Sequence, residues 1–217
     1  MRFLLWVIVA IVLIAGAFFI YDSQGAAPMP PASSTATSTT AALPVIIPGT
    51  PSVIYEDPQS GFSMYYPSTA LLETAGFEGY LPLTQSPVIA FTLNTDMFQG
   101  TNLGEAGVYV GATSSPAIVA DCMNPSSDAG ETQATSSQTI NGTAFSVFDS
   151  TGAAAGNIYQ EKAFRTVENG SCFEIVELLH SSQIGNYPPG KVVAFDQAKF
   201  SSILDAMVAT FAFKSAQ

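Results

Sequence analysis

Two Asn-Gly dipeptides, each lying between β-prone runs, constrain the fold of this chain more than any other feature of its sequence. Asn141-Gly142 separates residues 138–140 from 143–149, and Asn169-Gly170 separates residues 157–167 from 172–180. Asn and Gly tolerate the positive φ angles of a type I′ turn, which joins neighbouring antiparallel strands. The pattern predicts an antiparallel meander. Both sites also match glycosylation acceptors, with Thr143 and Ser171, but the turn interpretation needs no assumption about the host.

A second periodic segment predicts a helix close to the C-terminus. Its apolar residues recur at helical spacing and form a stripe that should lie on the sheet: Phe200, Ile203, Leu204, Met207, Val208 and Phe211. Asp196 suits the N-cap of this helix. Phe195 and Phe200 are placed to form a hydrophobic staple across its first turn.

Shorter signals complete the expected architecture. Further strands are expected at 53–56, 62–66, 88–93 and 107–112, with a bulge near Gly104 and Gly107. Ser115-Pro116 has the form of a helix start, and that short helix ends near residues 124–125. The loop 125–138 should be exposed, with Asp128 and Glu131 in solvent. The predicted class is α+β, an antiparallel sheet packed by a C-terminal amphipathic helix and a short middle helix.

The N-terminal segment predicts a membrane anchor. Residues 3–20 carry no charge, and as a helix they would be about 27 Å long, enough for a bilayer core. Arg2 precedes the segment and Asp22 follows it, so the N-terminus is expected in the cytoplasm and the remainder outside the cell membrane. Ser23, Gly25 and Ala27 leave cleavage as a signal peptide open.

Composition divides the chain into three parts. Residues 1–21 form the expected single-pass anchor, and residues 22–50 are rich in Pro, Ala, Ser and Thr, which predicts a flexible linker. Residues 51–217 are then the extracytoplasmic α+β domain.

The charge of the chain argues against nucleic acid as a partner. The formal net charge is −11, and apart from Arg2 and Asp22 every charged residue lies beyond position 50. Binding a nucleic-acid backbone requires a track of positive charge. The acidity is expected to serve solubility, with recognition of a cationic partner as the alternative.

The even cysteine count predicts one disulfide. Cys122 and Cys172 are the two cysteines of the sequence, and an exported domain reaches an oxidising compartment in which such a pair forms a bridge. Two buried free thiols are the alternative. A bridge closing a loop of this length would stabilise the fold by roughly 4 kcal/mol in the chain-entropy model.

Residues with familiar catalytic or metal-binding spacing are few. His180 is the single histidine, so a structural zinc site is not expected, and on one strand it lies too far from Cys172 to form a dyad. Glu174 and Glu177 are unusual within a β-prone run, but their odd spacing places them on opposite faces. Four acids are expected in loops: Asp57, Asp96, Asp128 and Glu131. Calcium is the metal best suited to them, but no EF-hand spacing is present.

One segment resembles a known group of proteins. The stretch YEDPQSGFSMYYP, residues 55–67, is similar to the opening of the PsbP/Mog1-like group, which implies an antiparallel sheet packed between helices. Ser68 and Thr69 stand where that group commonly has an aromatic residue. The meander, the YPPG at 187–190 and the closing helix also resemble uncharacterised anchored proteins of small-genome bacteria, which implies no activity.

These features together predict a membrane-anchored binding or envelope-associated module without cofactor or metal. Its partner would be an envelope protein or a small ligand, besides the membrane contacted by residues 3–20. The alternative is an extracytoplasmic hydrolase that uses paired carboxylates, which requires a cleft where two acids converge.

Overall fold

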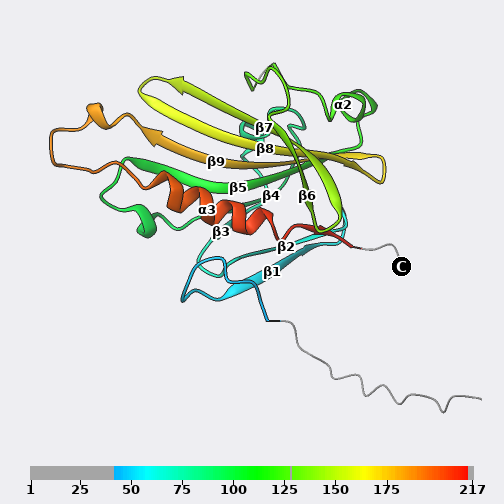
Figure 1. Ribbon diagram of the computed structural model, residues 1–217, viewed down its shortest axis with the longest axis horizontal. Coiled ribbons are helices and arrows are strands. Elements are labelled where there is room, and N and C mark those ends of the chain that lie inside the picture. Colours follow the sequence, from blue (N-terminus) through cyan, green and yellow to red (C-terminus); the bar gives the residue numbers. More distant parts are fainter. Residues whose placement is uncertain (1–41, 128, 215–217) are drawn as a thin grey trace, which may run out of the picture. The chain divides into compact units, whose positions relative to one another are not determined.

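The computed structural model describes residues 42–127 and 129–214 (Figure 1). The expected anchor and residues 22–41 of the expected linker lie outside the described residues. The compact unit begins at Ala42, and Ile46 is buried in its core. None of the helices in these ranges combines the length and the apolar character that a bilayer crossing demands.

A seven-stranded antiparallel sheet forms the centre of the fold, in the order β3-β4-β5-β9-β8-β7-β6. Its strands are β3 (Leu71–Glu73), β4 (Pro87–Thr92), β5 (Leu103–Thr113), β6 (Ser136–Ile140), β7 (Thr143–Ala154), β8 (Asn157–Glu168) and β9 (Ser171–Ser182). The four strands from β6 to β9 are neighbours in sequence order, which confirms the predicted meander.

Two-residue turns with positive φ join the strands of the meander. Asn141 and Gly142 have φ of 46° and 89°, and Asn169 and Gly170 have 49° and 75°. The β7–β8 turn is formed by Ala155-Gly156, a pair that the sequence analysis did not identify because Ala rarely adopts positive φ. These tight turns fix which residues lie opposite each other on neighbouring strands.

The N-terminal strands form a second sheet, a feature that the sequence did not predict. β1 (Ser52–Asp57) pairs with β2 (Phe62–Pro67), and β2 pairs in turn with β10 (Ala212–Phe213). The strand β3 was also missed, because a three-residue run carries too little pattern to be recognised. The bulge of β5 lies between Leu103 and Glu105, at Gly104 as expected.

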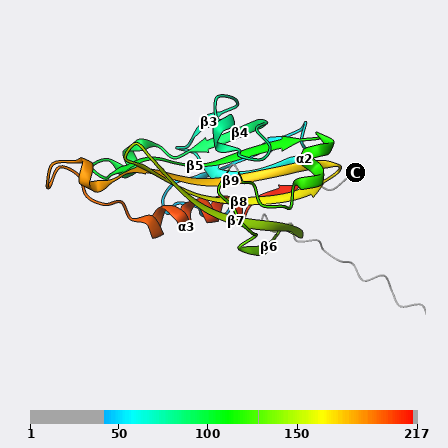
Figure 2. The ribbon, with the colours of Figure 1, turned by 90° about the horizontal axis from the view of Figure 1, so that it is seen from above.

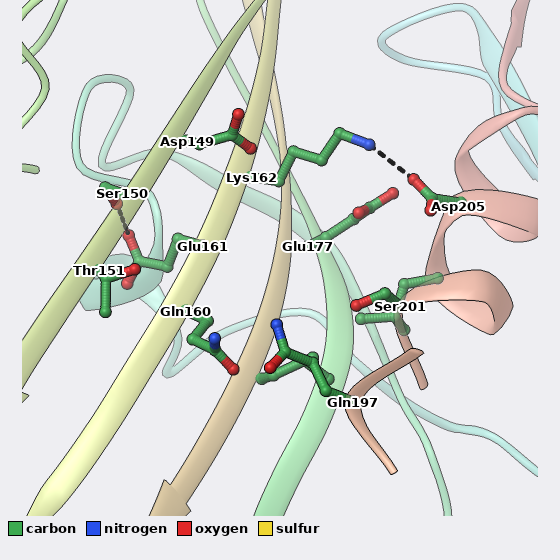
Figure 3. A pocket seen from close by; sticks show the side chains of 12 residues that line it. Asp149, Ser150, Thr151, Gln160, Glu161, Lys162, Glu177, Gln197, Ser201 and Asp205 are labelled. Atoms are coloured by element: carbon green, nitrogen blue, oxygen red, sulfur yellow. Dashed lines mark hydrogen bonds and ion pairs between the residues drawn. The ribbon is translucent and has the colours of Figure 1, made fainter. Parts of the chain in front are cut away.

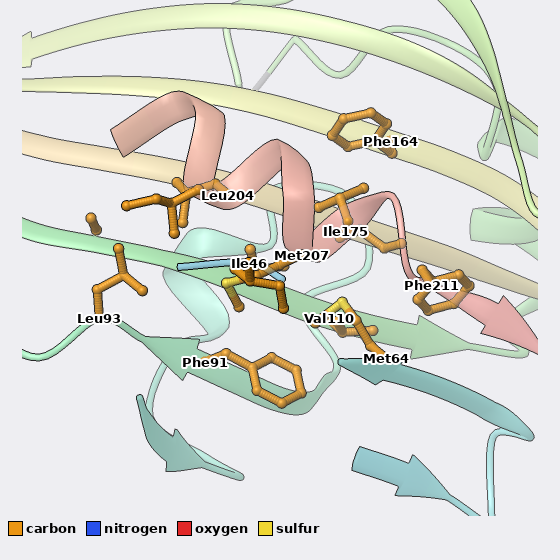
Figure 4. Packing of buried hydrophobic residues seen from close by; sticks show 14 of the residues in the cluster. Ile46, Met64, Phe91, Leu93, Val110, Phe164, Ile175, Leu204, Met207 and Phe211 are labelled. Atoms are coloured by element: carbon orange, nitrogen blue, oxygen red, sulfur yellow. The ribbon is translucent and has the colours of Figure 1, made fainter. Parts of the chain in front are cut away.

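The helix α3 (Gln197–Val208) lies along one face of the large sheet (Figures 1 and 2). The side chain of Asp196 accepts a hydrogen bond from the Lys199 amide at 3.0 Å, as expected of the N-cap. The rings of Phe195 and Phe200 lie 6.3 Å apart, which agrees with the predicted staple. Figure 4 shows the main core that this helix closes against the strands.

The opposite face of the large sheet is covered by loops and by the short helix α2 (Pro116–Asp121). The residue after α2, Cys122, forms the expected disulfide with Cys172 of β9 and is fully buried. Gly111 of β5 allows the loop of Leu81 and Thr84 to approach, because a Cβ at this position would meet both side chains. The α+β class with its two helices is thus confirmed.

The first asparagine turn also clamps the end of α3. The Asn141 side-chain amide donates hydrogen bonds to the carbonyl oxygens of Ala209, at 3.1 Å, and Phe211, at 2.8 Å. Asn169 occupies the same position in its own turn with nearly the same φ, and no side-chain hydrogen bond of it is seen among the described residues.

We expect Asn141→Ala to destabilise the domain by about 0.5–2 kcal/mol more than Asn169→Ala, because both lose the turn preference but only the first loses two side-chain hydrogen bonds, one exposed and one partly buried. Urea unfolding of the two variants and the wild type measures this difference. Equal losses in the two variants would show that the clamp contributes nothing.

Candidate functional site

A cavity of about 410 Å³ lies between α3 and the strands β7, β8 and β9; we call it the α3 cavity (Figure 3). Strand register builds its floor. Asp149 lies opposite Lys162, and Lys162 lies opposite Glu177. Because residues directly opposite share one face of a sheet, the three side chains form a row beneath the helix. The next strand, β5, continues the row with Val108.

Helix α3 supplies the other wall of the α3 cavity. Asp205 accepts a hydrogen bond from Lys162 Nζ at 2.6 Å. The two side chains are 32% and 50% exposed, so this ion pair is partly solvated and weak, about 0–1 kcal/mol. Lys162 can therefore leave Asp205 at little cost.

Glu177 is the unusual residue of this site. Only 5% of it is exposed, and its Oε1 is the one buried side-chain oxygen or nitrogen that lacks a hydrogen-bond partner among the described residues. Burial, and then the charge of Asp205, raise the pKa of Glu177 to about 8, although Lys162 opposes this shift. At neutral pH this carboxyl group is mostly protonated, and it ionises readily when a positive charge approaches.

The remaining walls of the α3 cavity combine amide, hydroxyl and short aliphatic groups. Gln160, Gln197 and Ser201 supply hydrogen-bonding groups, and Leu179 and Leu204 supply apolar surface. Glu161 borders the cavity as part of β8, but its side chain lies on the opposite face of the sheet, where burial raises its pKa and a hydrogen bond from Ser150 opposes the shift. Such a mixture of apolar wall and a few convergent polar groups is typical of small-ligand sites.

A second cavity of about 410 Å³ lies where the β1–β2 turn approaches the β8–β9 turn; we call it the turn cavity. Ser60, Thr113 and Glu168 are among its lining residues. No buried polar side-chain atom without a partner lines it in the described ranges. The α3 cavity is therefore the stronger candidate.

The opposite face of the same strands holds a buried arginine. Arg165 is fully buried and binds Glu131 through two hydrogen bonds of 2.7 and 2.9 Å. Its Nε donates to Glu174 at 2.9 Å, and its guanidinium lies 4.7 Å from the centre of the Phe148 ring. Glu174 also accepts hydrogen bonds from the Thr84 amide and hydroxyl. These charges are paired, so the cluster fastens two loops to the sheet.

This cluster corrects the expectation that Glu131 lies in solvent. Glu131 is 8% exposed, and besides Arg165 it accepts a hydrogen bond from the Ser126 amide at 2.7 Å. The loop composition predicted exposure, because Arg165 lies 34 residues further along the chain and no local pattern links it to Glu131. Asp128 lies outside the described residues.

His180 belongs to a cluster of aromatic and acidic side chains on the arginine face. Its ring stacks on Tyr159 at 4.4 Å, and its Nδ1 lies 3.8 Å from Glu105. Glu105 accepts hydrogen bonds from Tyr80, at 3.0 Å, and Tyr109, at 2.5 Å. These contacts satisfy the carboxylate and bind β5 to β9.

The acids considered for catalysis or calcium do not converge. Glu174 and Glu177 lie on opposite faces, as their odd spacing predicts. Asp57 accepts from the Ser60 amide and Asp96 from the Gln99 side chain, each within its own turn. Within the described ranges, no group of three or more His, Cys, Asp or Glu residues is arranged to hold a metal ion.

Comparison with known proteins gives little further information. No protein-family model and no curated protein matches the chain. A solution structure of cyanobacterial PsbP (CyanoP) from Synechocystis is 12% identical over 81% of this chain and 99% of that protein, with a TM-score of 0.46. A crystal structure from Bacteroides thetaiotaomicron is 16% identical over 75% of this chain, with a TM-score of 0.41.

These likenesses are weak ones. The chain spans about half the length of the Bacteroides protein, 48% of it. The weak resemblance to the PsbP group expected from residues 55–67 agrees with the comparison.

We expect Arg165→Met to destabilise the domain by about 3–5 kcal/mol, because it leaves two buried carboxylates without their counter-charge. Lys214→Met is the matched control: it removes the exposed ion pair with Glu56 and should cost about 0–1 kcal/mol. Chemical denaturation measures both, and similar losses would contradict a structural role of the buried cluster.

The raised pKa of Glu177 predicts that the contribution of this residue to the free energy of unfolding falls as the pH rises. The unfolded chain releases this proton near pH 4.5, and the folded chain retains it to about pH 8. Between these values each pH unit should lower the free energy of unfolding by roughly 1.4 kcal/mol. The stabilisation is complete below pH 4.5 and lost above pH 8.

Glu177→Gln tests this expectation, since the neutral amide removes the titration and keeps the shape. The stability of the variant relative to wild type should grow by up to about 4 kcal/mol from pH 5 to pH 8. Glu168→Gln, in the turn cavity, should keep the wild-type profile. Parallel wild-type and Glu177→Gln profiles in urea unfolding would refute the shift.

Proposed function

We propose that this chain is a non-enzymatic binding module whose α3 cavity takes a small polar ligand. The observation that carries the proposal is the buried Glu177 carboxyl with one oxygen unpaired at the floor of a cavity. Buried polar atoms in folded proteins are almost always hydrogen-bonded. An unpaired one beside a cavity therefore supports a site for a group that arrives from outside.

The placement of the side chains supports binding by a rigid site. Asp149, Lys162 and Glu177 stand on three hydrogen-bonded strands, and Asp205 stands on a capped helix that packs on the main core. Groups held by regular elements lose little conformational entropy when a ligand binds. The site is preorganised, as a binding module requires.

We also propose that the cavity faces the outside of a membrane. The uncharged residues 3–20, preceded by Arg2, support an anchor with this orientation. The Cys122–Cys172 bridge is consistent with an oxidising compartment. Recovery of the full-length chain from the soluble cytosolic fraction, with both thiols open to alkylation, contradicts this placement.

A hydrolase with paired carboxylates is the second candidate, favoured by one observation. Glu177 and Asp205 both line the α3 cavity, and one of them holds a proton at neutral pH. Hydrolysis also needs an ionised carboxylate free to act on water or substrate. Asp205 is paired with Lys162, and a neutral substrate would bring no cation to replace Lys162, so binding is the better supported function.

The experiment is a nuclear magnetic resonance screen of the isotope-labelled domain against neutral sugars, amino acids, organic acids and alkylamines. We expect at least one class to shift the amides of β8, β9 and α3 around the α3 cavity. Ser201→Phe should fill the cavity and abolish the shifts. The matched control Thr113→Phe places the same bulk at the turn cavity and should leave them unchanged.

Two results would overturn the proposal. One is the lack of shifts around the α3 cavity with every class of compound. The other is binding that survives Ser201→Phe and is lost in Thr113→Phe, which would assign the ligand to the turn cavity. Consumption of a bound compound by wild type and not by Glu177→Gln would favour the hydrolase.

A further inference from the structure

The charges around the α3 cavity are unbalanced in a way that selects the chemistry of a ligand. Three acids that line it, Asp149, Glu177 and Asp205, face the helix side of the sheet, and Lys162 is the one base among the described lining residues. Lys162 is held by Asp205 (Figure 3), and both side chains are more exposed than Glu177. The unpaired Oε1 of Glu177 has no cation of its own among the described residues.

We propose that the ligand of the α3 cavity is a small organic ammonium compound, whose cation lies between the carboxyl groups of Glu177 and Asp205. This inference rests on the proposed function of the cavity. It adds to that function the class of ligand and a coupling between binding and proton release.

Lys162 shows that the site accepts an ammonium group. Its Nζ lies 2.6 Å from Asp205 and 5.0 Å from the centre of the Phe164 ring. Carboxylates and aromatic faces both bind ammonium groups in proteins. Because the Lys162–Asp205 pair is partly solvated, an incoming ammonium can share or replace the Lys162 contact at small cost.

Ligands of other charge fit the site less well. A carboxylate or phosphate would be repelled by the surrounding acids, because bringing like charges together in a partly buried site disfavours binding. A neutral alcohol could bond to Glu177 but would leave the net negative charge of the site uncompensated. Leu179 and Leu204 provide apolar wall for a short aliphatic part of the ligand.

Binding of a cation must be coupled to the proton of Glu177. The charged groups that face Glu177 are Lys162 on β8, Asp149 on β7 and Asp205 on α3, and β5 places the apolar Val108 beside it. An ammonium at this place favours the ionised carboxylate and so expels the proton. The ligand keeps its own charge throughout, because an alkylammonium has an ordinary pKa of about 10.4.

The expected pH dependence follows from the pKa of Glu177 near 8. Below that value the cation must displace a proton to bind, and above it the carboxylate is already free. The affinity should therefore rise by up to about 50-fold from pH 6 to pH 8 if Glu177 is fully ionised in the complex. Any part of the proton that remains bound reduces this factor.

The test compares n-butylammonium, n-butanol and butyrate, which share a chain length and differ in charge. The full-length protein is titrated with each compound at pH 6 and pH 8 by nuclear magnetic resonance. We expect n-butylammonium to bind at least about 10-fold more tightly than n-butanol at pH 8, and butyrate not to bind. The carboxyl carbon of Glu177 should titrate at lower pH when n-butylammonium is present.

Glu177→Gln separates this coupling from simple charge attraction. The variant should bind n-butylammonium at least about 10-fold more weakly at pH 8 and should lose the pH dependence. Glu168→Gln removes one negative charge from the turn cavity and should change neither quantity.

The outcomes distinguish the two proposals. Equal affinity for n-butylammonium and n-butanol, or equal affinity at pH 6 and pH 8, overturns the ammonium inference. Binding of a sugar or an acid in the α3 cavity, with no response to amines, also overturns it and leaves the proposed function intact. If no compound of either set reaches the cavity, both proposals fail.

Discussion

The register of the β7–β8–β9 meander is the constraint on which both faces of this domain depend. Opposite residues are fixed by the turns at Ala155-Gly156 and Asn169-Gly170. A slip of one residue would exchange the two faces of a strand. Arg165 would then point into the main core, and Glu177 would point toward the loops on the opposite face of the sheet. Tight turns therefore matter for the chemistry of the domain as well as for its shape.

The same three strands hold buried charges on both faces, and the two groups differ in how they are satisfied. Arg165 binds two carboxylates, which in turn accept hydrogen bonds from loop amides. Glu177, across the sheet, retains an unpaired oxygen and faces a cavity. Full satisfaction indicates a structural cluster, whereas the unsatisfied oxygen of Glu177 is the observation behind the proposed ligand site.

The local structure could be predicted from the sequence because it depends on short patterns of neighbouring residues. The Asn-Gly turns, the apolar stripe and the Asp196 cap each depend on a few neighbouring residues, and the structure contains all of them. The β7–β8 turn was missed because Ala155 adopts a positive φ that only its tertiary setting imposes. The pairing of β2 with β10 was missed because nothing local links them.

The candidate site was partly within reach of the sequence. The turn at Asn169-Gly170 by itself places Lys162 opposite Glu177, so this pair could have been found by counting back from the turn. Adding Asp149 needs the unrecognised Ala155-Gly156 turn. Placing Asp205 in the site requires the position of α3 on the sheet. The helical period predicts which face of α3 packs on the sheet, but not where along the strands it lies. The burial of Glu131 required knowledge of a distant arginine, and no local pattern contains that.

The pairing of β2 with β10 has a consequence for how the domain folds. Residues 62–63 hydrogen-bond with residues 212–213, so the small sheet stays incomplete until almost the whole domain has been synthesised. Contacts between such distant positions carry a large loop-closure entropy and slow the folding reaction. A polypeptide of this kind stays open for longer after synthesis begins, because the β10 side of β2 has no partner until the last strand has left the ribosome.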